Sequence, residues 1–455
     1  MKLEVPKMVL LVYVLMILTC LSACGVDRRE GKTDLNIKPE MIIGTYGTPP
    51  LLQEYVGAYN MANRNYNIII KDYSKNGQVD FNEAWIEMIK DLSGTHSIDM
   101  INISNGGLIR LINSGFIEEL STYYERDFSE DDFVDSLYKT LIINNQIYTV
   151  CPFFKVSALV IKERALSNME DVSAKSFYNL INEYKDRMLI IDNLSRKDML
   201  ELLLENSLSE FIDLENGESH FESESFSEII KLCNTLPEDI KEYEWSDNDE
   251  KEIEQFREDK VLFISEDFCT PEDLKVAKEK AGEDIVVIGF PMNGECNPIV
   301  KTADINIAIT SGCNNKEEAW TFAKGCLLSE NQEISSLKKN SYIPIAKEAY
   351  NLMIKKAQEV EYYKDDNDNM VELPHRWIKG SGWEIKVNAV EKTEVDEFNE
   401  IIKNSKSNYN YYDEEIMKII LEETEAYFEQ KKSLADVEKI IQSRVSIFIH
   451  ENMIF

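Results

Sequence analysis

The chain has 455 residues, of which 44% are hydrophobic and 29% charged, and a formal net charge of −34. This length suggests two domains. The acidic balance argues against a nucleic-acid partner, because phosphates are neutralised by clustered Lys and Arg, and against polybasic attachment to anionic lipids. It either favours neutral or cationic solutes at long range or simply keeps an exposed protein soluble.

The N-terminus has the pattern of an export signal. Lys2 and Lys7 precede an apolar run at 8–21, which is shorter than the roughly 20 residues of a membrane span. The run ends in Leu-Ser-Ala before Cys24, which resembles the lipobox of bacterial lipoproteins. This resemblance implies a lipoprotein signal peptide at 1–23, a lipid on Cys24, and a location on the extracellular face of the cytoplasmic membrane. The alternatives are an uncleaved anchor or an ordinary secretory signal.

Strands and helices alternate after a polar stretch at 24–38 that we interpret as a flexible tether. Hydrophobic periodicity predicts strands and helices in turn at 41–46, 50–62, 66–70, 81–92, 99–103 and 107–114. Such alternation is typical of an α/β fold with a mainly parallel sheet.

Ligands of such sheets bind at the carboxyl ends of the strands. This indicates Tyr46, Asn102 and Ser104 as candidate ligand contacts. Packing of Tyr46 and turn capping by the other two are the alternatives.

The rest of the chain continues as a mixed pattern. We expect strands at 147–154, 156–161, 263–264 and 286–288, a helical acidic region between 162 and 258, and helices at 317–328 and 413–452. The stretches 364–369 and 403–410 are polar and are expected to be surface loops.

Several short motifs then occur in a characteristic order. Asn145-Gln-Ile-Tyr-Thr-Val-Cys-Pro152 is similar to a "G-k-x-Y-x-x-P" crossover, although Asn145 replaces the glycine. Further loose motifs lie at 256–263, 288–291, 315–322 and 343–345. Together they resemble the extracellular solute-binding proteins of ABC importers, family 1, the maltose-binding-like lipoproteins.

The resemblance implies a two-lobe, periplasmic-binding-protein-like (type II) α/β fold with an interlobe hinge and cleft. It divides the chain into 39–151 and 288–328 for lobe 1, and 152–287 and 329–455 for lobe 2 with the C-terminal helices. It implies a monomer that passes a small solute to ABC permease subunits and attaches to the membrane through its lipid. The alternative is a surface lipoprotein that senses a solute or peptide for a signalling partner.

We expect a non-enzymatic receptor without a cofactor, because the sequence has neither a P-loop nor a recognisable nucleophile motif. A surface hydrolase is the disfavoured third interpretation. Most members of the resembled family bind sugars or oligosaccharides, whose faces stack on aromatic rings while polar side chains bind the hydroxyls. The family pattern implies stacking roles for Phe268 and Trp383, and a cleft-facing position for Phe153 or its neighbour Phe154. The alternative roles are core packing for the phenylalanines and a surface-loop anchor for Trp383.

No metal site is expected. The four histidines are not at ligand spacing, and the cysteines form no CxxC pair. An extracellular address permits disulfides, but spacing does not assign them. The segment 72–83 places Asp72, Gly77 and Glu83 at positions 1, 6 and 12 of a calcium loop. A strand precedes it, so a plain strand-to-helix loop is the favoured interpretation.

Overall fold

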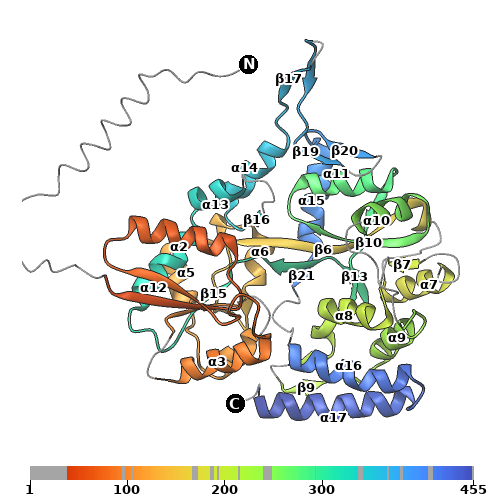
Figure 1. Cartoon of the computed structure of the whole chain (residues 1–455), viewed down its shortest axis with the longest axis horizontal. Coiled ribbons are helices and arrows are strands. Elements are labelled where there is room, and N and C mark those ends of the chain that lie inside the picture. The colour runs from red at the N-terminus through yellow and green to blue at the C-terminus, as the bar shows by residue number, and fades with distance from the viewer. Residues whose placement is uncertain are drawn as a thin grey trace, which may run out of the picture. The chain divides into compact units, whose positions relative to one another are not determined.

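The computed structural model describes residues 38–94, 98–103, 107–166, 173–184, 189–191, 194–213, 216–238, 248–292, 294–336, 342–365, 368–379, 383–407 and 413–452. Contacts divide the chain into Met1–Pro39 and Glu40–Phe455. The predicted signal peptide and Cys24 therefore lie outside the described residues. Glu40–Phe455 is a mixed helix and strand fold with two main sheets, each the centre of one lobe (Figure 1).

The smaller sheet has the strand order β15–β3–β1–β2. Its strands are β1 (Glu40–Thr45), β2 (Asn67–Asp72), β3 (Met100–Asn102) and β15 (Ile307–Ile309). The first three are parallel, with Ile43 opposite both Ile70 and Met100, and β15 is antiparallel to β3. This confirms the alternating pattern predicted for this region.

The helices of this lobe begin at residues that favour helix starts. Pro50 is the first residue of α2 (Pro50–Ala62), where its fixed φ and missing N–H are tolerated. The side chain of Asp80 accepts a hydrogen bond from the Glu83 amide and caps α3 (Phe81–Ser93). The short α4 (Leu108–Asn113) follows β3 and buries Leu108 and Leu111.

The larger sheet has seven strands and is organised around β6 (Phe153–Lys162). Its path runs β21–β14–β6–β10–β7, and β11 and β16 also pair with β6. The bounds are β7 (Leu189–Ile191), β10 (Val261–Phe268), β11 (Ile285–Val287), β14 (Ile299–Thr302), β16 (Ile343–Pro344) and β21 (Lys406–Ser407).

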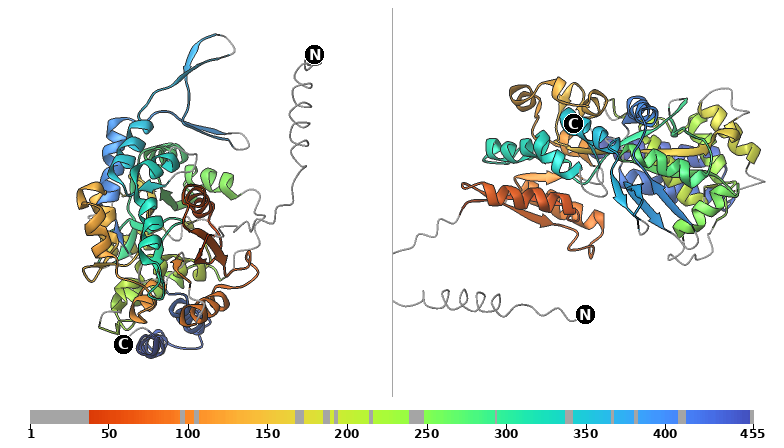
Figure 2. Two further views of the ribbon diagram at one scale, coloured as in Figure 1. Left: turned by 90° about the vertical axis from the view of Figure 1, so that its left-hand side faces the viewer. Right: turned by 90° about the horizontal axis from the view of Figure 1, so that it is seen from above.

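Side chains of β6 alternate between two hydrophobic cores. Phe154 and Val156 belong to the core shared with the smaller sheet, whereas Leu159 and Ile161 enter a second core. The second core is closed by α7 (Ala174–Tyr184), α8 (Arg196–Ser207), α9 (Glu224–Cys233), α16 (Glu414–Phe428) and α17 (Leu434–Asn452). The two C-terminal helices therefore complete the lobe built on the larger sheet (Figures 1 and 2).

The remaining elements surround these two sheets. The helices are α5 (Ser121–Asp127), α6 (Asp135–Thr140), α10 (Asn248–Arg257), α11 (Pro271–Ala281), α12 (Lys316–Leu327), α13 (Ser329–Ser336), α14 (Lys347–Ala357) and α15 (Lys392–Asn404). The hairpins pair β4 (Ile142–Ile143) with β5 (Gln146–Ile147), β8 (Ile212–Asp213) with β9 (Glu218–Ser219), β12 (Phe290–Met292) with β13 (Glu295–Asn297), β17 (Tyr362–Lys364) with β18 (Met370–Glu372), and β19 (Arg376–Lys379) with β20 (Glu384–Val387). No described helix is both long and apolar enough to traverse a bilayer.

One predicted boundary differs from the structure. The expected division placed 288–328 in the first lobe, but β14 pairs with β6 along 299–302 in the larger sheet. The chain re-enters the smaller sheet only at β15. The sequence of these short strands does not show which sheet receives them, because both begin with buried apolar residues.

The turn before β12 requires glycine at one position. Gly289 has a φ of +75°, and a Cβ there would lie 2.0 Å from the carbonyl carbon of Asn297. Gly294 in the same hairpin has a φ of +82° but nothing within 4 Å of a Cβ. The two glycines thus share a backbone conformation and differ in the space around them.

This pair gives a matched test of packing. Gly294→Ala should lower the free energy of unfolding by about 1 kcal/mol, because only the left-handed backbone is penalised. Gly289→Ala should cost at least about 3 kcal/mol, because the β13 backbone must also move. Urea denaturation of both variants measures the difference, and equal losses would contradict the close approach.

Candidate functional site

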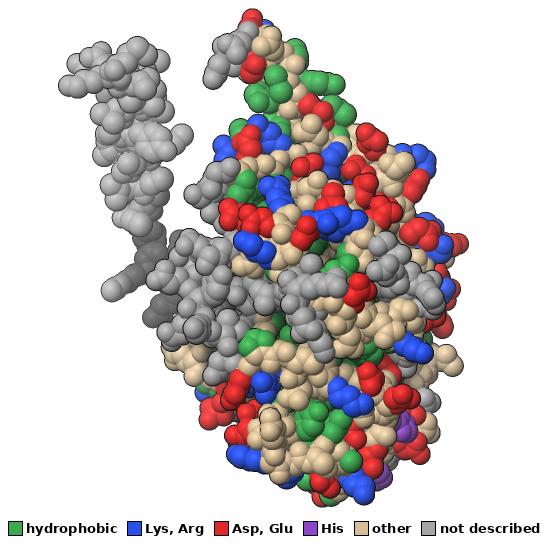
Figure 3. Space-filling view, turned by 90° about the vertical axis from the view of Figure 1, so that its right-hand side faces the viewer, with side chains coloured by type: hydrophobic (Ala, Val, Ile, Leu, Met, Phe, Trp, Pro, Cys, Tyr) green, Lys and Arg blue, Asp and Glu red, His purple; other side chains and the backbone are tan. Residues whose placement is uncertain are grey.

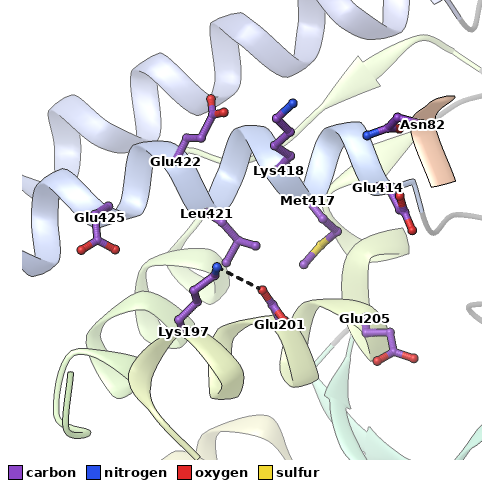
Figure 4. A pocket seen from close by; sticks show the side chains of 10 residues that line it. All are labelled: Asn82, Lys197, Glu201, Glu205, Glu414, Met417, Lys418, Leu421, Glu422 and Glu425. Carbon is purple, nitrogen blue, oxygen red and sulfur yellow. Dashed lines mark ion pairs between the residues drawn. The ribbon is translucent and has the colours of Figure 1, made fainter. Parts of the chain in front are cut away.

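A polar groove lies between α8 and α16 in the larger lobe, and α3 of the smaller lobe reaches its rim. The cavity has a volume of about 590 Å³, within the range of small-molecule sites. Figure 4 shows the side chains that line it: Asn82, Lys197, Glu201, Glu205, Glu414, Met417, Lys418, Leu421, Glu422 and Glu425. Met417 and Leu421 supply the apolar floor, and the other residues supply hydrogen-bonding groups.

The groove is acidic. Five of its residues are glutamates and two are lysines, and Lys197 lies 3.9 Å from Glu201. Burial raises the pKa of Glu201. Burial, followed by the charges of Asp413 and Glu415, raises the pKa of Glu414. These partly desolvated carboxylates can accept hydrogen bonds from hydroxyl or ammonium groups of a ligand.

A second polar cluster, which we call the strand-edge cluster, lies on the larger sheet beside α8. It consists of Lys155, Ser157, Asp267, Lys301 and Glu205. Asp267 accepts hydrogen bonds from the Lys155 ammonium at 2.6 Å and the Ser157 hydroxyl at 2.5 Å, and Lys301 donates to Glu205 at 2.6 Å. Because Glu205 also lines the groove, the cluster and the groove are continuous.

Strand register explains the strand-edge cluster. Lys301 of β14 is directly opposite Lys155 of β6, and Asp267 of β10 is opposite Ser157. Directly opposed residues project to the same face. Burial lowers the pKa of Lys155, but the hydrogen bond and charge of Asp267 outweigh it, so the net effect raises that pKa. Lys155 thus stays charged at the end of β6 nearest the smaller lobe.

Arg110 is one point of contact between the two lobes. Arg110 of α4 places Nε 3.1 Å from Oδ2 of Asp413, the N-cap residue of α16. Its guanidinium lies 5.2 Å from the Trp85 ring of α3 and 5.7 Å from the Phe448 ring of α17. We call this arrangement the interlobe clamp.

The interlobe clamp is largely desolvated, with side chains 17% exposed for Arg110 and 4% for Asp413. Burial raises the pKa of Asp413, and the charge of Arg110 opposes that shift. The contacting nitrogen and oxygen form no aligned hydrogen bond, so charge and ring stacking hold the pair. The contact joins α4 of the smaller lobe to the start of α16 in the larger lobe.

The structure places the predicted ligand residues in different environments. Ser104 lies outside the described residues. Tyr46 is half-buried, donates a hydrogen bond to the Val79 carbonyl at 3.3 Å and stacks edge-on with Phe81. Asn102 is buried and binds backbone between the lobes, donating to the Asp304 carbonyl and accepting from the Asn306 amide. Asn102 therefore holds the segment between β14 and β15.

The predicted aromatic contacts do not line the groove. Phe153 and Phe268 are fully buried, and so is Phe154, which differs from the expectation that one of the adjacent pair faces the cleft. Trp383 packs against Ile385 and Val387 in a small separate cluster, and its indole N–H has no hydrogen-bond partner among the described residues. In this conformation the groove is bounded by charged rather than aromatic side chains.

Two carboxylates of the segment proposed as a possible calcium loop, those of Asp72 and Asp80, accept hydrogen bonds from backbone amides. Asp72 accepts hydrogen bonds from the Gly47 and Ser74 amides at 2.9 Å and from the Asn76 amide at 3.1 Å. Asp80 caps α3. Within the described parts of the chain, no three His, Cys, Asp or Glu side chains are grouped to hold a metal ion.

The sequence did not reveal the groove, the strand-edge cluster or the clamp. Lys155 and Ser157 alternate with apolar residues in β6, and this period of two is the signal that could have identified a polar face. No local signal links Arg110 to Asp413, because they are far apart in the chain.

The interlobe clamp can be tested by a double-mutant cycle. Arg110→Ala should lower the free energy of unfolding by about 2–3 kcal/mol, because a buried carboxylate loses its partner. Asp413→Ala in that background should add less than it does alone. The exposed pair Lys139–Asp135, 2.8 Å apart, is the matched control and should couple by less than about 1 kcal/mol. If the losses of unfolding free energy in the Arg110 and Asp413 variants are additive, the two residues do not interact and the clamp is excluded.

Solved structures with the same fold exist, although no protein-family model and no curated protein sequence matches the chain. The sugar-binding protein MalE from Xanthomonas citri is 11% identical, with a TM-score of 0.56 over 90% of this chain and 98% of that one. An ABC substrate-binding protein from Listeria monocytogenes in complex with cycloalternan is 12% identical, with a TM-score of 0.55 over 91% and 99%. Maltose-bound MalE3 from T. maritima is also 12% identical, with a TM-score of 0.53 over 90% and 99%. The predicted two-lobe, MalE-like fold is thereby confirmed.

Proposed function

We propose that this protein is a receptor that captures a sugar or oligosaccharide between its lobes and delivers it to an ABC importer. The observation that carries the proposal is the coincidence of a two-lobe fold with a polar groove of about 590 Å³ between α8 and α16, whose rim Asn82 of the smaller lobe reaches. Its structural neighbours include proteins bound to cycloalternan and maltose.

The chemistry of the groove is consistent with a polyhydroxylated ligand. Carboxylates of Glu201 and Glu205 can accept hydrogen bonds from sugar hydroxyls, and Lys197 can donate to hydroxyl or ring oxygens. Lys301 is bonded to Glu205 at the margin of the groove. Met417 and Leu421 offer an apolar surface for the ring face. Charged hydrogen-bonding groups each contribute about 1.5–3 kcal/mol.

Capture would work through the hinge. A ligand that contacts both lobes shifts an open–closed equilibrium by its differential affinity for the two states. Asn82 from the smaller lobe and Glu414 from the larger lobe line the same cavity, so one ligand can contact both. The protein itself then needs no catalytic step, since transport would be driven by other subunits.

The cellular location is part of the same proposal. The lipobox-like sequence before Cys24 supports lipid attachment at the extracellular face of the cytoplasmic membrane. An anchored receptor would stay close to its permease.

A thermal-shift screen of the full chain against mono-, di- and oligosaccharides, with peptides as a second class, tests the proposal. A ligand that binds only the folded state raises the melting temperature by mass action. We expect a shift with one glycan class. A shift with peptides alone would favour a sensor, and the absence of any sugar shift would reject the receptor.

Site variants then locate the binding. Lys301→Ala and Glu205→Ala should weaken the affinity for the identified glycan about tenfold each, because each removes one charge-assisted hydrogen bond. Lys139→Ala and Asp135→Ala, which break an exposed ion pair elsewhere, should leave it unchanged. Isothermal titration calorimetry gives the dissociation constant of each of the four variants. If all four variants change it equally, the ligand binds outside the groove.

A further inference from the structure

Exposed apolar side chains concentrate on one projecting hairpin. Seven of the thirteen exposed large hydrophobic residues in the described chain lie between 360 and 377, with exposures from 39% to 62%. Six of them lie on β17–β18 or within two residues of it, namely Val360, Tyr362, Tyr363, Met370, Val371 and Leu373, and Trp377 lies on the adjacent β19. The other six are dispersed over the chain. Grouped exposed apolar side chains typically mark an interaction site.

The hairpin does not serve the core. Strands β17 and β18 pair with each other and with no other described strand, and the ribbon stands away from the body (Figures 1 and 2). Tyr363 opposes Val371 on one face, whereas Tyr362 and Met370 belong to the other. A two-stranded ribbon with both faces exposed gains little stability on its own, so folding does not account for these side chains.

The base of the hairpin is firmly attached. Arg376 donates to the Thr270 hydroxyl at 2.7 Å and to Asp273 at 2.5 Å, and both acceptors belong to the N-terminal capping box of α11. His375 lies 3.2 Å from Glu272. The ribbon is therefore held in place at its base, which favours a binding element.

The charge of the hairpin restricts what can cover it. Residues 359–373 contain six Asp or Glu and one Lys, in a chain of net charge −34, and that Lys364 is paired with Asp368 at 2.7 Å. A second copy would bring the same carboxylates, and an anionic lipid surface would also be repelled. A polypeptide with basic and apolar side chains is complementary.

We propose that β17–β18 docks an extended, basic and apolar segment of a partner protein by adding a strand to the open edge of the hairpin. Unpaired backbone N–H and C=O groups at such an edge are a template for another strand. Green side chains gather on the projection at the top of Figure 3, which leaves this surface open. The hairpin and α16 lie at opposite ends of Figure 1, so docking would leave the groove accessible.

The test uses the full chain and two short fluorescent peptides, one alternating valine with lysine and one alternating valine with glutamate. The wild type should bind the valine–lysine peptide in fluorescence anisotropy, and the combined variant Tyr362→Ser, Tyr363→Ser, Met370→Ser and Val371→Ser should bind it at least tenfold more weakly. The matched control is Ile86→Ser with Ile447→Ser, two exposed apolar residues elsewhere, which should bind like the wild type.

Several results would overturn the proposal. They are the absence of binding to the wild type, equal binding to the hairpin variant, and a dimer in sedimentation that the hairpin variant abolishes. If that variant fails to fold, Glu361→Lys keeps the apolar surface and should weaken binding of the valine–lysine peptide. Sugar binding is measured on the same variants and should be unaffected, so failure of either proposal is distinguishable from failure of the other.

Discussion

The pairing of β6 with four other strands is the constraint on which the rest of the structure depends. β10, β11, β14 and β16 are all bonded to this one ten-residue strand. Its alternate side chains enter two different cores, so it cannot slip by one residue without exchanging them. The same register brings Lys155 and Ser157 to the face where Asp267 and Lys301 lie. Core packing and the polarity of the site are therefore set by one register.

The C-terminal helices extend this arrangement to the other lobe. α16 and α17 close the core beneath the larger sheet, and the first residues of α16 also meet Arg110 and the rim of the groove. A late segment of the chain thus couples packing of one lobe to contact with the other. The interlobe clamp is part of this coupling, because its members belong to both lobes.

Strong local patterns were predictable from the sequence. The strand–helix alternation of the first lobe, the start of α2 at Pro50 and the two-lobe fold were all found. The ligand-facing side of a strand was harder to assign, as Phe268 shows. It was expected to stack on a sugar, yet its neighbour Asp267 faces the polar cluster while Phe268 is buried. Adjacent residues of a strand point to opposite faces, so a loose motif does not distinguish them.

Burial lowers the reactivity of the cysteine thiols in this fold. Five of the six described cysteines are buried. The exception, Cys269, is half-buried, and burial together with the nearby Asp273 raises its pKa to about 12. Thiolate is the form that attacks disulfides and oxidants, and almost none is present at neutral pH. In an oxidising compartment the five buried thiols would be shielded by inaccessibility, and Cys269 by its raised pKa.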